Sequence, residues 1–433
     1  MIDFLQGLPC RALLTSIILR GSRGAGLSTS TGTSISPPVK EDFWMFAQSK
    51  KMEAVPFSPI RKIFAEVDKL KAEGVDIITL GIGEPDFDTP AHITEAMAAA
   101  TRNGATHYTA NKGIVQLREA VCRKLKVEDG LEYDPEEIIC TVGVSEGVYV
   151  SLSSFLDPGD EVLVPDPSWV SYFHVPTMNG AVPKGYPLRE ENAFQIDVDD
   201  LEKLVSPRTK MMVVLDPSNP VGAVQEKETL ARIAEFAVKH NLLVISDEIY
   251  EKIIYDGKKH YSIAAFPGMR ERTIVLNGFA KAYAMTGWRI GYIAAPAELI
   301  SVMNRMHMYI VTHTSAQAQW GALAALEGPQ EPVAGMVEEF RKRRDYVCRR
   351  IGGMKKVSCR VPGGAFYVFV NIKETGMGAE EFTKYLIREA HVAVVPGTAF
   401  GSHGEGYVRL SYAVSMENLE KSMDRIEKAV ASL

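Results

Sequence analysis

The sequence predicts an α/β protein built around a mostly parallel β-sheet. From Glu95 onward, short apolar runs of strand length alternate with longer helical patterns, which is the order of elements typical of a parallel sheet covered by helices. Polar clusters follow these runs, and open α/β sheets bind ligands at the carboxyl ends of their strands. The clearest expected strands are 161–165, 210–215, 242–246 and 273–276.

The first 51 residues differ in composition from the rest of the chain. They contain three arginines, many Ser and Thr residues and few acids. We expect residues 1–51 to lie outside the fold. The segment is either an organellar transit peptide or upstream sequence read from a start codon placed too early, with Met45 or Met52 as the true start.

The composition excludes several classes of protein. With 46% hydrophobic and 24% charged residues, the chain of 433 residues resembles an ordinary soluble enzyme of one large domain or two parts. A net charge of −6, without a basic run among aromatics, argues against binding to nucleic acid or a membrane surface. Five cysteines without CxxC spacing predict a reduced, cytoplasmic protein. The nine histidines show no metal-ligand spacing, so no metal is expected.

One segment places a lysine and an arginine on either side of a glycine. Lys281 comes just past the expected strand 273–276, where its amine can form a Schiff base with an aldehyde. Arg289, two residues after Gly287, can return to the same crevice and bind an anion with its planar guanidinium. This pair suits an aldehyde cofactor that carries a phosphate. The alternative is an exposed lysine and a structural arginine.

The segment from Asn277 to Tyr292 resembles the lysine motif of fold-type I pyridoxal-phosphate aminotransferases, in the aspartate aminotransferase family. The similarity runs from about residue 52 to the end, and 80–90 and 395–400 are especially similar to archaeal aromatic and aspartate aminotransferases. The resemblance implies pyridoxal 5'-phosphate as cofactor. It also implies a large cofactor-binding domain and a smaller α+β domain made from both chain ends, with the boundaries 52–95, 96–324 and 325–433.

An acidic residue directly follows the expected strand 242–246. A carboxylate at this place, Asp247, can keep the nitrogen of a pyridine ring protonated, which makes the ring an electron sink. Tyr250, three residues on, can donate a hydrogen bond to the phenolic oxygen of the ring. The alternative role for Asp247 is the N-cap of a helix.

Two turns match cofactor-binding turns of the family. Asn219, in the turn that begins at Asp216, is expected by resemblance to bind the phenolic oxygen and the substrate carboxylate. Val144 and Ser145 precede a helical pattern, and backbone N–H groups at such a helix start suit a phosphate. This chain has Gly278 where many relatives have a phosphate-binding serine, so other donors must replace it.

Three further positions match substrate-facing residues of the family. Trp169 falls where an indole stacks on the pyridine ring, with a core tryptophan as the alternative. Arg409, in an alternating strand pattern, matches the arginine that receives the substrate α-carboxylate, with a surface arginine as the alternative. Gly83 lies in a loop where the lack of a Cβ allows a close approach to substrate.

Tyr108 matches the tyrosine that relatives direct to the phosphate of the neighbouring subunit. This match implies a homodimer with shared active sites.

The sequence therefore predicts an aminotransferase that moves an amino group from an L-amino acid, aromatic or aspartate-like, to a 2-oxo acid such as 2-oxoglutarate. Ile60 lies on a segment that, by resemblance, lines the side-chain end of the pocket, which favours an apolar donor. A carbon–sulfur lyase on the same fold is the alternative. Both kinds of enzyme form a carbanion from the amino acid with the same site, and small differences decide how the carbanion then reacts. A non-enzymatic regulator would need a DNA-binding module, and residues 1–51 lack its pattern.

Overall fold

The computed structural model describes residues 48–433 except residue 58. Residues 1–47 of the expected N-terminal extension lie outside the described part, whereas Lys50 and Lys51 begin the short helix α1 (Lys50–Glu53). Among the described helices, none is long and apolar enough to span a lipid bilayer.

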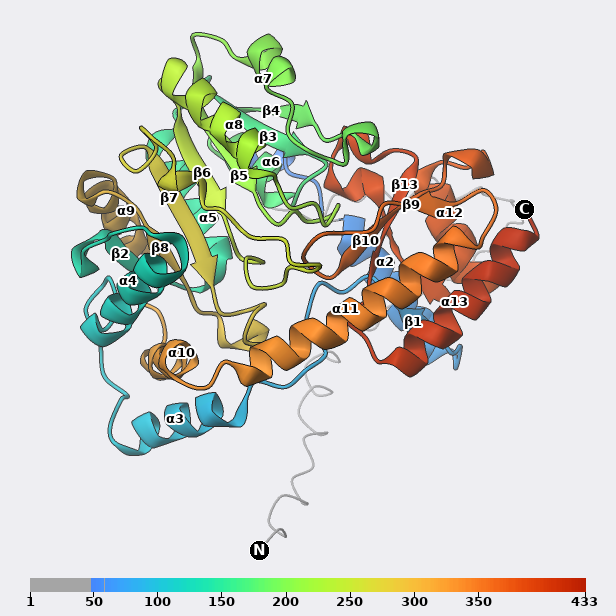
Figure 1. The fold of residues 1–433 in the computed structure, drawn as a ribbon, viewed down its shortest axis with the longest axis horizontal. Coiled ribbons are helices and arrows are strands. Elements are labelled where there is room, and N and C mark those ends of the chain that lie inside the picture. Colours follow the sequence, from blue (N-terminus) through green and yellow to red (C-terminus); the bar gives the residue numbers. More distant parts are fainter. Residues whose placement is uncertain (1–47, 58) are drawn as a thin grey trace, which may run out of the picture. The chain divides into compact units, whose positions relative to one another are not determined.

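A seven-stranded sheet forms the centre of the larger part of the fold (Figure 1). Six strands run parallel and β8 runs antiparallel to both of its neighbours. The four expected strands are confirmed as β3, β5, β6 and β7, although β6 begins one residue later and includes Asp247. In spatial order the strands are β2 (Ile138–Thr141), β8 (Gly291–Ala294), β7 (Thr273–Gly278), β6 (Leu243–Asp247), β5 (Thr209–Leu215), β3 (Glu161–Asp166) and β4 (Val182–Pro187).

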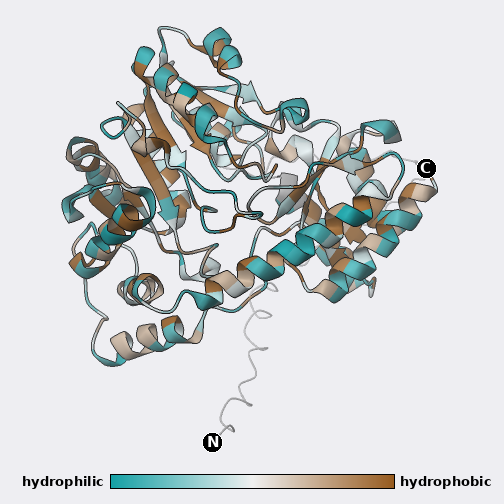
Figure 2. Cartoon of the chain, viewed as in Figure 1, coloured by the Kyte–Doolittle hydropathy of each residue, from teal (hydrophilic) through white to brown (hydrophobic). Residues whose placement is uncertain are grey.

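Helices cover both faces of this sheet, and for that reason its strands are apolar on both sides. Along β5, Met211 and Val213 pack on one face while Met212 and Val214 pack on the other. Figure 2 shows the resulting apolar sheet inside more polar helices. One face carries α5 (Gly143–Phe155), α6 (Ser171–Met178) and α9 (Ala297–Ile310). The other carries α4 (Val115–Asp129), α7 (Val198–Leu204), α8 (Lys227–Lys239) and α10 (Ala316–Glu327), and α3 (Ala91–Arg102) packs on α10.

A second core forms around a smaller antiparallel sheet. Its order is β12 (Val395–Pro396), β13 (Tyr407–Ser411), β10 (Tyr367–Asn371) and β9 (Ser358–Cys359). A separate parallel pair joins β1 (Ile78–Thr79) to β11 (Val392–Ala393), so the two ends of the described chain meet here. The accompanying helices are α2 (Pro59–Ala72), α11 (Glu331–Gly352), α12 (Ala379–Tyr385) and α13 (Met416–Ala431). The exact division into two domains stays a prediction.

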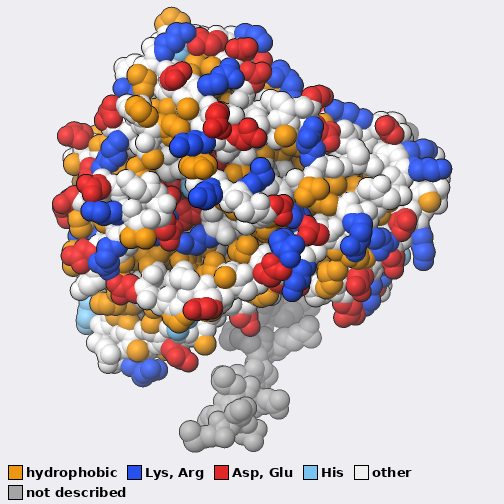
Figure 3. All heavy atoms as spheres, in the orientation of Figure 1, with side chains coloured by type: hydrophobic (Ala, Val, Ile, Leu, Met, Phe, Trp, Pro, Cys, Tyr) orange, Lys and Arg blue, Asp and Glu red, His pale blue; other side chains and the backbone are white. Residues whose placement is uncertain are grey.

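The face shown in Figure 3 carries acidic and basic side chains interspersed with one another. A nucleic-acid footprint would instead gather basic side chains on one stripe.

Candidate active site

A cavity of about 380 Å³ lies at the carboxyl ends of the central strands, next to the smaller sheet. The register places Leu215, Asp247 and Leu276 side by side, so the segments that follow β5, β6 and β7 meet at one edge. The lining comprises Phe64, Gly81, Ile82, Gly83, Glu84, Val144, Ser145, Trp169, Leu215, Asn219, Asp247, Ile249, Tyr250, Ala280, Lys281, Thr286, Arg289, Tyr367, Phe400 and Arg409. Every expected site residue except Tyr108 is among them.

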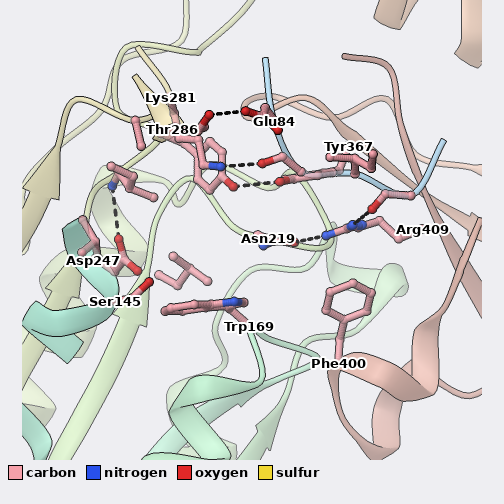
Figure 4. Close-up of a pocket in the computed structure, with 18 of the residues that line it drawn as sticks. Glu84, Ser145, Trp169, Asn219, Asp247, Lys281, Thr286, Tyr367, Phe400 and Arg409 are labelled. Carbon is pink, nitrogen blue, oxygen red and sulfur yellow. Dashed lines mark hydrogen bonds between the residues drawn. The ribbon is translucent and has the colours of Figure 1, made fainter. Parts of the chain in front are cut away.

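Lys281 lies three residues after the end of β7, and its ammonium points into the cavity (Figure 4). Its Nζ donates to the carbonyl oxygen of Gly83 at 2.5 Å. The rings of Tyr250 and Phe366 lie 5.9 and 5.7 Å from the same atom. Burial lowers the pKa of Lys281 to about 8, because a charged amine loses hydration there. A large share of this lysine is therefore neutral, and nucleophilic, near pH 8.

Asp247 is buried at the last position of β6. Its Oδ2 accepts a hydrogen bond from the Tyr172 hydroxyl at 2.6 Å, and its Oδ1 accepts one from the N–H of Ile249 at 3.2 Å. Burial raises the pKa of Asp247 to about 6. No helix begins at Asp247 in the structure, so the helix N-cap alternative does not hold. No sequence pattern indicated Tyr172 as a partner of Asp247.

Arg409 comes from β13 and is buried, so the surface alternative for this residue is wrong. Its guanidinium donates to Asn219 Oδ1 at 3.0 Å and to the Gly81 carbonyl oxygen at 2.6 Å, while its Nε has no hydrogen-bond partner in the described chain. The rings of Tyr367 and Phe400 lie 4.4 and 4.7 Å away. Burial lowers the pKa of Arg409, and among the described residues no carboxylate pairs with it. The site therefore holds a cation suited to an incoming carboxylate.

The start of α5 and Arg289 together form a small cradle. Val144 and Ser145 belong to the first turn of α5, where backbone N–H groups are free of helical partners. Arg289 has a positive φ of 54° and donates to the Thr286 carbonyl oxygen at 2.8 Å. A Cβ at Gly143 would lie 2.5 Å from an Arg289 nitrogen, so the glycine lets the guanidinium approach the helix start.

This chain has Gly278 where many relatives have a phosphate-binding serine, and the structure shows a steric reason for the glycine. A Cβ at this position would lie 2.9 Å from the Cα of Gly291 on the neighbouring strand. A serine here would therefore require the two strands to move apart.

The remaining expected substrate residues also line the cavity. In Figure 4, Asp247 and Arg409 lie at opposite ends, with Trp169 and Asn219 between them. Trp169 is only partly buried, with its ring edge-on to Tyr172 at 5.9 Å, and so is not a simple core tryptophan. A Cβ at Gly83 would collide with the Tyr367 hydroxyl, which explains the need for glycine.

Tyr108 does not line the cavity of its own chain. Its side chain is 87% exposed and contacts the ring of His313 at 5.5 Å. The expectation that it reaches a neighbouring subunit stays a prediction.

Several lining residues were not expected from the sequence. Tyr367 hydrogen-bonds to Tyr250 at 2.8 Å, between the two hydroxyls. The structure places Tyr367 near Arg409 because Phe369, two residues further along β10, pairs directly with Arg409. Glu84 accepts a hydrogen bond from Thr286 and so ties the substrate-facing loop to the lysine segment.

Phe64 and Phe400 add apolar surface to the cavity. Ile60 belongs to α2, as Phe64 does, but its side chain lies outside the described residues.

The family model for aminotransferase class I and II matches residues 75–426. The chain belongs to this family. An aromatic-amino-acid aminotransferase 2 from Thermococcus litoralis is 47% identical over 388 residues, which cover 89% of this chain and 98% of the relative. An aspartate aminotransferase from Pyrococcus abyssi is also 47% identical, over 89% of this chain and 98% of its own length.

Among solved structures, an aromatic aminotransferase from Pyrococcus horikoshii matches this class I and II aminotransferase with a TM-score of 0.81 and 45% identity. The match covers 84% of this chain and 98% of that one. The expected fold and enzyme class are thus confirmed: the protein is a transaminase. The names of these relatives favour this activity over the carbon–sulfur lyase and the regulator.

Proposed function

We propose that this aminotransferase uses pyridoxal 5'-phosphate to move an amino group from an L-amino acid, with an aromatic donor preferred, to a 2-oxo acid, with 2-oxoglutarate as acceptor. One observation carries the proposal. A single cavity brings together a lysine whose pKa is lowered to about 8, a buried carboxylate and a buried arginine that lacks a carboxylate partner among the described residues.

The residues present fit this cofactor. The cradle of Val144, Ser145 and Arg289 offers backbone N–H groups, a hydroxyl and a guanidinium to a phosphate. The carboxylate of Asp247 is buried at one end of the cavity, as a partner for a pyridinium nitrogen must be. Asn219 and Tyr250 provide donors for a phenolic oxygen, and Trp169 provides a flat ring for stacking.

Lys281 is the residue that we assign to covalent attachment of the cofactor and to proton movement. When bound, pyridoxal phosphate supplies an aldehyde that captures amines and a ring that withdraws electrons from the substrate α-carbon. Near pH 8 the Nζ of Lys281 exists in both protonation states, so it can take a proton and return it. Asp247 stabilises the positive charge that such a ring requires.

Arg409 orients the substrate. Its Nε lacks a partner in the described chain, and a planar carboxylate can bind to this N–H and a neighbouring one as a bidentate pair. The Asn219 side chain holds the guanidinium plane by accepting its hydrogen bond. The α-carboxylate of an amino acid would therefore bind at the end of the cavity opposite Asp247.

The lining of the cavity favours aromatic donors. Phe64, Ile82 and Phe400 contribute apolar side chains, and burial of such surface stabilises an aromatic group. The cationic side chains among the lining residues are Lys281, Arg289 and Arg409. All three are assigned to the cofactor or the α-carboxylate, so none of them remains for the distal carboxylate of aspartate.

The decisive experiment compares the specificity constants of tyrosine, phenylalanine, aspartate and alanine with saturating 2-oxoglutarate. Lys281→Ala is the inactive control. We expect the aromatic donors to give the highest kcat/KM. A far higher value for aspartate would refute the aromatic preference, and ammonia and pyruvate formed without an oxo-acid acceptor would identify a lyase instead.

Shared active sites in a homodimer, and a cytoplasmic location, belong to the same proposal. The exposed Tyr108 lies outside its own cavity, as a residue that serves a second subunit would.

A further inference from the structure

A buried histidine lies between two carboxylates beneath the active site. The imidazole of His260, in the segment between β6 and β7, is 7% exposed. Its Nδ1 lies 3.6 Å from Asp216 Oδ2, and its Nε2 lies 3.3 Å from Glu248 Oε2. The reaction as assigned above uses none of these three side chains.

Both carboxylates belong to strand ends that carry site residues. Asp216 directly follows β5 and begins the turn that contains Asn219. Glu248 directly follows Asp247 at the end of β6. His260 therefore joins the two segments that hold the cofactor-facing side chains.

The remaining oxygen of each carboxylate already has hydrogen-bond donors. Asp216 Oδ1 accepts from the N–H of Gln225 at 2.8 Å. Glu248 Oε1 accepts from the hydroxyls of Ser246 at 2.7 Å and Ser262 at 2.6 Å. Asp216 Oδ2, Glu248 Oε2 and both ring nitrogens of His260 have no hydrogen bond within the described chain, so the ring faces the two carboxylates at ion-pair distance.

Two buried carboxylate oxygens that face one ring favour protonation of both ring nitrogens. A neutral imidazole has one N–H and would turn a lone pair toward the second carboxylate. Burial by itself would lower the pKa of His260, but the charges of Glu248 and Asp216 outweigh this effect and raise it well above its usual range. Burial also opposes ionisation of Glu248, yet His260 and the two serine hydroxyls hold the pKa of Glu248 below its usual value.

We propose that His260 is a positioning residue: as an imidazolium it joins the ends of β5 and β6 and keeps Asp247 ionised. The part that concerns Asp247 rests on the proposed function. Burial is the main cause of the raised pKa of Asp247, and the charge of Glu248, its neighbour in sequence, raises it further. An imidazolium that neutralises Glu248 weakens this repulsion, so that Asp247 can remain a carboxylate for a pyridinium partner.

The other charged groups around His260 are paired with one another. Asp129 and Glu251 each place an oxygen within 4.8 Å of a ring nitrogen. The ammonium of Lys124, from α4, lies 3.1 Å from Asp129 Oδ2 and 2.5 Å from Glu251 Oε2. The Lys124 ammonium is the cation that pairs with these two acids, whereas Asp216 and Glu248 face the ring nitrogens of His260.

The protonation state of His260 can be measured directly by ¹⁵N NMR on the full-length holoenzyme labelled at histidine. We expect one ring, assigned by its loss in His260→Gln, to keep two protonated nitrogens at pH 8. Glu248→Gln should lower the pKa of this ring, which gives a second assignment if His260→Gln does not fold. A neutral ring at pH 7 would overturn the proposal, whatever cofactor the protein binds.

Kinetics test the effect on Asp247. His260→Gln should move the acidic limb of kcat/KM about one pH unit upward, which is about a tenfold loss of rate on that limb. The double variant His260→Gln with Glu248→Gln should recover most of this loss, because the uncompensated charge is gone. His240→Gln is the matched control, since His240 pairs with Glu202 at 3.1 Å on the surface.

A double variant as impaired as His260→Gln would show a merely structural role and overturn the proposal. If the proposed function itself is wrong, the experiments would give a different result. In that case the wild-type enzyme would show no cofactor bound at Lys281, while the NMR result would still stand.

Discussion

Replacing Lys281 by methionine should make the apoprotein more stable while abolishing transamination. Methionine keeps most of the length of the side chain, being one atom shorter, and removes the buried charge. The fall of the pKa of Lys281 from 10.5 to about 8 means that the folded state pays about 3 kcal/mol to hold this ammonium at neutral pH. Loss of the hydrogen bond to Gly83 offsets about 1 kcal/mol of this gain. We expect a net stabilisation of about 2 kcal/mol at pH 7.

The stabilisation should depend on pH in a defined direction. The pKa of Lys281 is lower in the folded state, so between about pH 8 and 10.5 the unfolded chain binds more protons than the folded one. The stability of the wild type therefore rises with pH across this window. Below about pH 8 both states carry the proton and the full cost remains. The advantage of Lys281→Met should be largest at pH 7 and should vanish by about pH 10.

Urea denaturation of both apoproteins at equal concentration, at pH 7 and pH 10, measures this difference. Turnover of the reconstituted variant should fall at least about 10³-fold. Equal stability of the two proteins at pH 7, or an advantage that does not change with pH, would refute the conclusion that burial destabilises the charged lysine.

Three further predictions concern the other site residues. Asp247→Ala should cripple proton abstraction yet still allow the cofactor to attach to Lys281, as borohydride reduction and peptide mapping would show; near-normal turnover would exclude its role. Arg409→Lys keeps the charge but loses the planar pair of donors, so kcat/KM should fall about 100-fold, mainly through KM; an unchanged KM would contradict the assignment. Mixing Lys281→Ala subunits with inactive Tyr108→Ala subunits should restore some activity, because one hybrid site carries neither lesion; no recovery after confirmed subunit exchange would argue against shared sites.

Local patterns were sufficient to predict the strands and the polar residues that follow them. After their first residue, the runs 161–165, 210–215 and 273–276 are apolar because both faces of a parallel sheet are covered, and this makes them easy to recognise. Since parallel strands present their carboxyl ends at one edge, residues that follow them, such as Asp247 and Lys281, were expected to meet.

Partners contributed by distant segments could not be predicted in this way. Tyr172 binds Asp247 across 75 positions, and Tyr367 reaches Tyr250 across 117. No local pattern encodes such pairs, because they depend on how the two sheets and their helices pack.

The sequence by itself determined the kind of chemistry: local periodicity placed a lysine after one strand and an acid after another, and resemblance to the family added an arginine in a third segment. Only the tertiary structure decided how these groups ionise. The lowered pKa of Lys281 and the raised pKa of Asp247 both result from burial. The imidazolium of His260, as we infer it, results from two carboxylates brought together by adjacent strands. Desolvation and charge proximity are properties of packing, so they arise only when segments far apart in the chain come into contact.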